Sequence, residues 1–280
     1  MENTFTRGDV PPNPLEKAGY TLEFHDEFDS PTLDTSKWLP FYLPQWSSRA
    51  RSAPNYTIEN SCLLLHITKD QPAWCPEFDG EVRCSSLQTG QFSGAVGSKV
   101  GQHLFNKALV VREAQENTRR YTPQYGYFEL RAKGLKTSPN LAALWMIGYE
   151  DTPEKSSEIA VFELVGARTG AESSAVRYGV HPWADPNISD EFYEDTFPID
   201  TSQFHLYAVE WTPTHIDFYL DNVKIRTIQQ SAPYPMQFML SLYEHRFDGA
   251  WTGVYDPHAP YPKTFTIDYF RAYQPVGGYA

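Results

Sequence analysis

Short runs of alternating apolar and polar residues recur along the chain. They are clearest at 20–28, 63–67, 125–132, 207–211 and 216–220, and β-branched and aromatic residues are common within them. Such alternation is typical of strands with one buried face. Turn residues such as Pro213 and the pair Asp221-Asn222 separate the runs. Because long helical periodicity is hard to find, the pattern favours an all-β sandwich over an alternating α/β fold.

The same pattern predicts one domain. Residues 1–18 are polar and Pro-rich and are expected to form an extended arm, and residues 19–280 are expected to form a single β-sandwich domain. The stretch 71–124 is rich in Gly, Ser and charge, which indicates long loops interleaved with short strands. Long ordered loops on a rigid scaffold commonly carry the functional site.

Composition narrows the class of partner. The net charge of -12 argues against nucleic acid and against an anionic membrane surface, because both are bound through clustered Lys and Arg. No apolar run has membrane-spanning length. The first 14 residues lack the apolar core of a signal peptide, so we expect a cytoplasmic monomer, or a secreted one if a signal segment precedes residue 1. Aromatic residues make up 15% of the chain, which suits either an aromatic core or stacking against sugar rings.

The three cysteines do not decide the compartment. The spacing of Cys62, Cys75 and Cys84 fits no metal motif. Cys75 and Cys84 flank a short acidic loop and are candidates for a disulfide, whereas Cys62 lies beside an apolar run and is expected to be a buried thiol.

The most informative segment is the apolar run 157–165, which contains Glu158 and Glu163. In a regular strand these two side chains are out of phase, but a β-bulge with one extra residue would bring them to the same face. Two acids in a strand of Ile, Val, Phe and Leu are costly unless they face a wet cleft. Retaining glycoside hydrolysis requires such a pair, with carboxyl groups about 5–5.5 Å apart. A strand with two acids facing solvent is the alternative.

The surrounding motifs, in order, resemble glycoside hydrolase family 16, the laminarinase-like class. The segments that carry the resemblance are 26–29, 33–38, 125–132, 143–148, 158–163, 204–213, 216–221 and 268–273. The resemblance implies a curved, concanavalin A-like jelly roll with a carbohydrate cleft on the concave sheet. It also implies that Glu158 is the nucleophile, that Glu163 is the general acid/base, that Trp145 lies under the sugar and that His181 lines the cleft.

The chain departs from the family pattern at two places. Ala160 stands where the family has an Asp that bonds a catalytic carboxyl, so another donor is expected to reach Glu158, and His181 is the nearest candidate in the sequence. Arg49 and Arg51 occupy the region of the family's substrate-binding loop, which puts laminarin in doubt; they are either a clamp for an acidic or heavily hydroxylated sugar or solvated loop charges.

Further substrate-binding candidates come from loop aromatics and one acid. Trp46, Trp183 and Trp251 lie in loops rich in Pro, Gly and Asp, as sugar-stacking residues often do, and Glu244 ends an apolar strand near the expected cleft. The chemistry needs no cofactor. The resemblance implies a structural calcium on the convex face, with Glu27 and Asp268 at the matching positions.

The sequence therefore predicts a retaining, endo-acting hydrolase of a β-linked polysaccharide, with β-1,3- or β-1,3/1,4-glucan ahead of β-galactan. Two alternatives stay open. A catalytically silent, lectin-like protein would explain Ala160, and a transglycosylase of the same fold would differ only in the acceptor.

Overall fold

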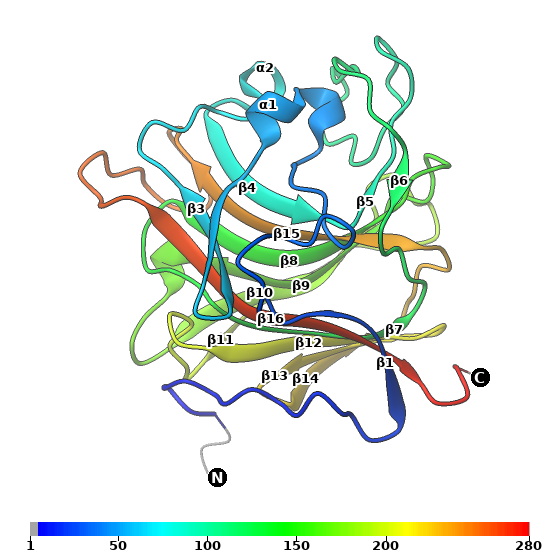
Figure 1. Ribbon diagram of the computed structural model, residues 1–280, viewed down its shortest axis with the longest axis vertical. Coiled ribbons are helices and arrows are strands. Elements are labelled where there is room, and N and C mark those ends of the chain that lie inside the picture. The colour runs from blue at the N-terminus through cyan, green and yellow to red at the C-terminus, as the bar shows by residue number, and fades with distance from the viewer. Residues whose placement is uncertain (1–4, 280) are drawn as a thin grey trace.

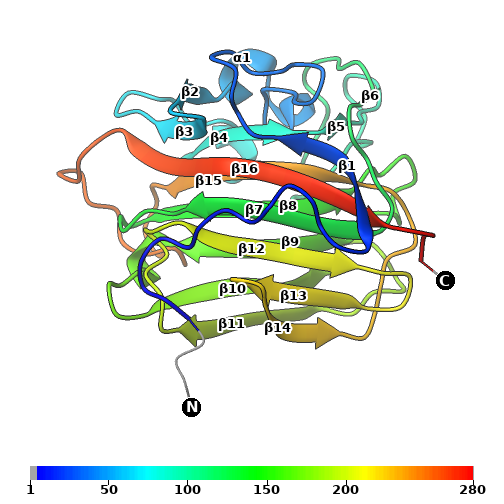
Figure 2. The ribbon, with the colours of Figure 1, turned by 60° about the horizontal axis from the view of Figure 1, so that its bottom comes forward.

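The predicted alternation forms two curved antiparallel sheets in the computed structural model, which describes residues 5–279. The outer sheet has eight strands in the order β14-β13-β12-β7-β16-β3-β2, with β1 paired to β16. The inner sheet has six strands in the order β11-β10-β9-β8-β15-β4. The inner sheet curves like a bowl that opens toward the early loops, and the outer sheet lies behind it (Figures 1 and 2).

The strand bounds follow the apolar runs closely. The outer sheet comprises β1 (Tyr20–Asp26), β2 (Asn55–Glu59), β3 (Cys62–Ile67), β7 (Gly126–Lys133), β12 (His205–Trp211), β13 (Ile216–Leu220), β14 (Val223–Ile228) and β16 (Lys263–Pro275). The inner sheet comprises β4 (Val82–Gln88), β8 (Asn140–Gly148), β9 (Glu158–Val165), β10 (Ser174–His181), β11 (Glu191–Phe197) and β15 (Met236–His245).

Alternation along the inner strands separates two apolar clusters. On β8, Leu144 and Met146 pack between the sheets in the main core, with Phe128 and Phe238 from neighbouring strands. Trp145 points the other way, into a second cluster on the concave face. Because side chains alternate across a strand, one run of buried residues supplies both the core and the floor of the bowl.

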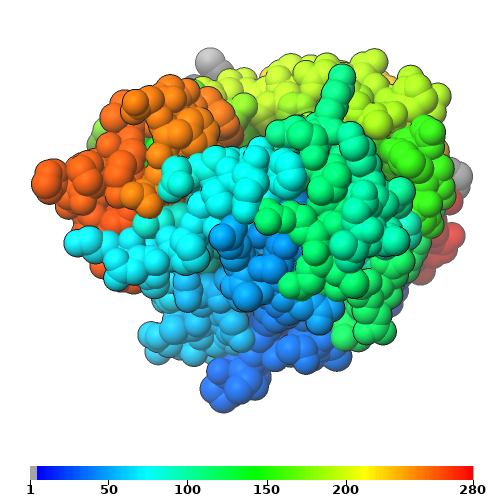
Figure 3. Space-filling view, turned by 90° about the horizontal axis from the view of Figure 1, so that it is seen from above, coloured from blue at the N-terminus to red at the C-terminus, as the bar shows by residue number. Residues whose placement is uncertain are grey.

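Loops and short elements cover part of that concave face. They are η1 (Pro44–Trp46), α1 (Arg49–Ser52), α2 (Pro76–Asp79), β5 (Gly90–Gln91), β6 (Thr118–Arg119) and, after β9, η2 (Gly166–Arg168). Seen from above, the early loops, in blue to green, and the late loop around residues 246–262, in orange, gather on this side of the molecule (Figure 3). They bring residues distant in sequence onto the inner sheet.

Three expectations need comment. The polar sequence of β4 hid a fully buried strand at one end of the inner sheet, in the stretch expected to be mostly loops. Cys75 and Cys84 do not pair: the two thiols are buried and free, and the Cys75 thiol faces the Trp46 carbonyl oxygen at 3.3 Å. The described part of the arm runs along the outer sheet, where the Val10 amide donates to the Phe204 carbonyl oxygen at 2.7 Å.

No helix among residues 5–279 has the length and apolar character needed to cross a membrane.

Candidate active site

A β-bulge on β9 brings the two predicted acids to one face. Trp145 on β8 pairs with Ala160, and the next position back, Leu144, pairs with Phe162, so Val161 is the extra residue. The register with β10 shifts across the same segment. Val161 and Phe162 both point into the main core, and Glu158 and Glu163 both face the concave side. The predicted bulge is confirmed.

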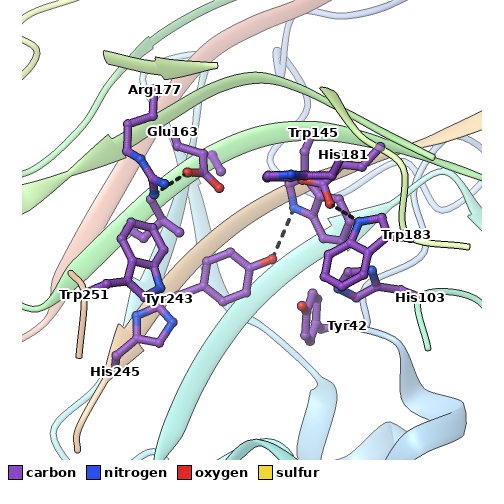
Figure 4. A pocket seen from close by; sticks show the side chains of 13 residues that line it. Tyr42, His103, Trp145, Glu163, Arg177, His181, Trp183, Tyr243, His245 and Trp251 are labelled. Atoms are coloured by element: carbon purple, nitrogen blue, oxygen red, sulfur yellow. Dashed lines mark hydrogen bonds and ion pairs between the residues drawn. The ribbon is translucent and has the colours of Figure 1, made fainter. Parts of the chain in front are cut away.

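The two glutamates line a cleft of about 370 Å³ on the concave face of the inner sheet. Its walls come from β8, β9, β10 and β15 and from four loops (Figure 4). The lining residues are Tyr42, His103, Leu141, Ala143, Trp145, Glu158, Glu163, Arg177, His181, Trp183, Tyr243, His245 and Trp251.

Glu158 is held by an indole. The Trp183 Nε1 donates to Glu158 Oε2 at 2.8 Å. Burial raises the pKa of Glu158 to about 7, with a smaller increase from the charge of Glu163, while His181 and the Trp183 hydrogen bond oppose the rise. His181 was predicted to be the donor to Glu158, and that prediction is wrong. His181 lies directly across from Glu158 on β10, but its Nδ1 faces Asp190 at 2.5 Å.

The loop that carries Trp183 is fixed from behind. Trp183 has φ 48°, a left-handed conformation that is rare for a bulky residue and needs support from its surroundings. The Ala184 amide donates to Ser156 Oγ at 2.9 Å. The Tyr234 hydroxyl bonds Asp185 Oδ2 at 2.6 Å and accepts the Ser157 amide at 2.9 Å. These bonds tie the loop to the start of β9, so the indole donor is pre-organised toward Glu158.

Glu163 is held by a guanidinium instead. Arg177, its cross-strand partner on β10, places Nη1 2.8 Å from Glu163 Oε2 and is itself mostly buried. Burial raises the pKa of Glu163, and the positive charge of Arg177 opposes that rise. Arg177 also lies over the Trp251 ring at 4.1 Å and within 3.4 Å of Glu194.

Trp145 lies on the cleft floor, as predicted. Its Nε1 donates to the Tyr243 hydroxyl at 3.2 Å, which fixes the ring plane. Trp183 and Trp251 are half-exposed and form opposite walls (Figure 4). The predicted positions of these three tryptophans in the cleft are therefore consistent with the geometry.

Four predicted substrate-binding residues do not line the cleft. Trp46 is fully buried and donates to the Gln102 carbonyl oxygen at 2.8 Å, so it packs under a loop and has no face to offer a sugar. Glu244 is fully buried against Arg83 at 3.1 Å, because β15 turns it away from the cleft. Arg49 bonds Gln115 and Arg51 pairs with Glu77 on the exposed loop surface.

The predicted calcium ligands are also engaged elsewhere. Glu27 bonds Arg271 through both oxygens, at 2.8 and 2.7 Å, and Asp268 pairs with Arg131 at 2.7 Å. Residues 5–279 contain no cluster of three or more His, Cys, Asp or Glu side chains suited to a metal. These two carboxylates do not fit a calcium site, because an arginine already neutralises each of them.

Sequence reasoning missed seven lining residues, and strand alternation would have found five of them, of which Leu141 and Ala143 share the face of Trp145 on β8. Arg177 shares a strand face with His181, and Tyr243 and His245 flank Glu244 on the opposite face of β15. Tyr42 and His103 come from loops whose paths no local pattern encodes.

Residues 111–270, more than half of the chain, match the family model described as Glycosyl hydrolases family 16. The chain belongs to glycosyl hydrolases family 16. The family resemblance and the curved jelly-roll fold predicted from the sequence are confirmed.

Among solved family 16 structures, the chain is similar to the GlcNAcα1-4Gal releasing endo-β-galactosidase from Clostridium perfringens. The two are 35% identical with a TM-score of 0.84, over 97% of this chain and 66% of that one. A laminarinase from Flavobacterium sp. UMI-01 is 20% identical with a TM-score of 0.62, over 91% of this chain and 100% of that one. At that identity the likeness shows the fold alone.

Two curated relatives that match nearly the whole chain are longer than it. Glucan endo-1,3-beta-glucosidase A1 from Niallia circulans is 25% identical over 92% of this chain, which spans 38% of that protein. Kappa-carrageenase from Pseudoalteromonas carrageenovora is 25% identical over 94% of this chain and 68% of its own length.

Proposed function

We propose that this protein is a retaining, endo-acting β-glycosidase in which Glu158 is the nucleophile and Glu163 the general acid/base. The observation that carries the proposal is the bulge at Val161, which puts both carboxyl groups in one cleft. Glu158 attacks the anomeric carbon while Glu163 protonates the leaving oxygen, and Glu163 then deprotonates the water that releases the sugar.

The electrostatics support a pair that shares one proton near neutral pH. Both pKa values are raised by burial, and the charge of Glu163 raises that of Glu158. Interaction between the two carboxyl groups disfavours the doubly ionised pair. The assignment of Glu158 as nucleophile and Glu163 as acid/base follows the family resemblance. With Ala at position 160, the polar contacts of the two glutamates come from Trp183 and Arg177.

For the substrate we propose a glycan with an internal β-galactoside, ahead of the β-1,3-glucan favoured from the sequence. The support is similarity: the endo-β-galactosidase structure is 35% identical over 97% of this chain, whereas the laminarinase structures are 18–20% identical. Arg49 and Arg51, which cast doubt on laminarin, lie outside the cleft and no longer bear on the choice.

A panel of β-galactans, galactose-containing oligosaccharides and β-glucans, assayed for new reducing ends, tests the proposal. We expect endo-products from a galactose-containing member. Glu158→Gln keeps the size and the hydrogen-bonding capacity of the side chain but removes the nucleophile, and should lower kcat by roughly 10⁴-fold or more. Binding of a panel member without turnover by the parent protein would favour the lectin-like alternative. Products longer than the substrate would favour transglycosylation.

A further inference from the structure

Trp183, the donor to Glu158, lies in a tight turn that its own side chain does not favour. The Asp185 amide donates to the Pro182 carbonyl oxygen at 2.8 Å, which closes a four-residue turn with Trp183 in its second position. The φ of 48° at that position is a value that bulky residues rarely adopt. The surrounding structure must therefore hold the turn in place.

The Tyr234 hydroxyl holds the end of this turn. It donates to Asp185 Oδ2 at 2.6 Å, and the other oxygen of Asp185 accepts the Asn187 amide at 2.8 Å. Because Asp185 and Tyr234 are only 4% and 6% exposed, water competes little for the bond. Burial and this carboxylate both raise the pKa of Tyr234, so the phenol keeps its proton.

The same hydroxyl holds the residue before Glu158. It accepts the Ser157 amide at 2.9 Å, and the Ser157 hydroxyl lies 2.8 Å away. A phenol has one hydrogen to donate and two lone pairs to offer, so with Asp185 as its acceptor it receives both Ser157 bonds. These three bonds use the full capacity of the Tyr234 oxygen.

The Tyr234 ring is anchored in the protein core. It packs in the apolar cluster between the two sheets, just before Met236 begins β15. A densely packed core holds a side chain in one position, whereas a loop can move as a unit. The oxygen is therefore a fixed point to which the turn and the start of β9 are both attached.

We propose that Tyr234 is a positioning residue for the reaction, because its hydroxyl sets the separation of the Trp183 indole and the Glu158 carboxyl from a single point. Asp185 follows Trp183 by two residues, and Ser157 immediately precedes Glu158. Both ends of the 2.8 Å indole-to-carboxyl bond are thus tied to one oxygen. The inference rests on the proposed function, since the reaction depends on this bond only if Glu158 is the nucleophile.

Tyr234 acts through Trp183 and is not among the residues that line the cleft. Tyr234→Phe should therefore leave KM within about twofold and lower kcat by about three- to tenfold. It should also raise the pKa of Glu158, because the Trp183 bond opposes the rise that burial causes. The charged side chains that also act on Glu158 stay in place: Glu163, His181 and Asp190.

The experiment observes the Trp183 indole by NMR. In isotope-labelled protein its Nε1–H resonance, assigned by its loss in Trp183→Phe, should titrate with Glu158 near pH 7. In Tyr234→Phe the midpoint of this titration should rise by up to about 0.7 unit. In profiles of kcat/KM against pH, the double variant Tyr234→Phe/Trp183→Phe should shift no further than Trp183→Phe alone, because both substitutions act on one bond.

Tyr269→Phe is the matched control. Tyr269 is buried in the outer sheet, where its hydroxyl likewise donates to a carboxylate, Glu129 Oε1 at 2.6 Å, and accepts a backbone amide, that of Asn13 at 3.3 Å. Its loss should lower the melting temperature, as Tyr234→Phe also should, but should leave the Trp183 titration in place.

Ser157→Ala removes only one of the three bonds to Tyr234 and should raise the midpoint by a smaller amount, so it decides the question if Tyr234→Phe does not fold. An unmoved midpoint in the folded variant, or an equal rise in Tyr269→Phe, would overturn the positioning proposal. So would additive shifts in the double variant. If the parent cleaves no member of the glycan panel, the proposed function fails, and the indole titration alone decides whether Tyr234 sets the bond between Trp183 and Glu158.

Discussion

The two ends of the cleft hold their glutamates by different means. At one end a neutral donor from a loop, Trp183, bonds Glu158, and at the other a cation on the adjacent strand, Arg177, pairs with Glu163. An indole donor favours the carboxylate by one hydrogen bond, whereas a guanidinium adds a full charge. In a strand that lacks the family's Asp, residues outside that strand can therefore set the pKa values of the two glutamates. Because Trp183 and Arg177 act on different glutamates, each can be substituted separately.

The largest effect expected from a change at the Arg177 end of the cleft tests the role assigned to Glu163. Glu163→Ala should lower kcat by about 10²–10⁴-fold on a substrate with a poor leaving group, because general acid catalysis is lost. With an activated leaving group, added azide should restore turnover, since azide attacks without a base, and give a β-configured product. Glu158→Gln should not be rescued. An α-azide from Glu163→Ala would reverse the two roles.

Removing the positive charge of Arg177 should shift the pH dependence of kcat/KM. Arg177 lowers the pKa of Glu163, so Arg177→Met should raise that pKa and shift the limb that Glu163 controls to higher pH by about one unit. Arg177→Lys, which keeps the charge, should shift it less. The profile of kcat/KM against pH measures this effect. Arg168→Met removes a neighbouring arginine that pairs with Glu194, and should leave the profile in place. An unmoved profile in Arg177→Met would show that the ion pair does not tune Glu163.

Removing the indole donor of Trp183 should shift the pH dependence of kcat/KM by a smaller amount. Trp183→Phe keeps an aromatic ring but removes the hydrogen bond that lowers the pKa of Glu158 below what burial alone would give. Since one hydrogen bond is worth about 1 kcal/mol, the limb controlled by Glu158 should rise from about pH 7 by roughly 0.7 unit. Trp251→Phe, at the other end of the cleft, is the matched control. A profile displaced equally by the two variants would contradict the specific role of Trp183.

The smallest expected effect concerns the outer sheet, far from this pair. Because Arg271 and Arg131 neutralise Glu27 and Asp268, we expect chelation followed by calcium addition to leave the melting temperature unchanged. A rise in melting temperature on adding calcium would restore the family-based prediction and require other ligands.

Much of the candidate site was predictable because its signals are local. The alternation located most strands, and the odd spacing of Glu158 and Glu163 in an apolar run required a bulge if both were to face a cleft. The errors came from contacts between distant segments. Trp46 was predicted to stack on sugar from the composition of its loop, but that loop folds inward and buries the ring. Glu244 was chosen over its neighbours because the face of β15 was not assigned.

The sequence by itself determined the two-sheet architecture and the acid pair on β9, since side-chain alternation and a single extra residue are properties of one strand. Only the tertiary structure decided what surrounds that pair. Trp183 reaches Glu158 from a turn anchored by Tyr234, Arg177 reaches Glu163 through strand register, and His103 arrives from a loop between distant strands. These contacts depend on register and on loop packing, which join residues far apart in the chain and leave no periodic signal along it.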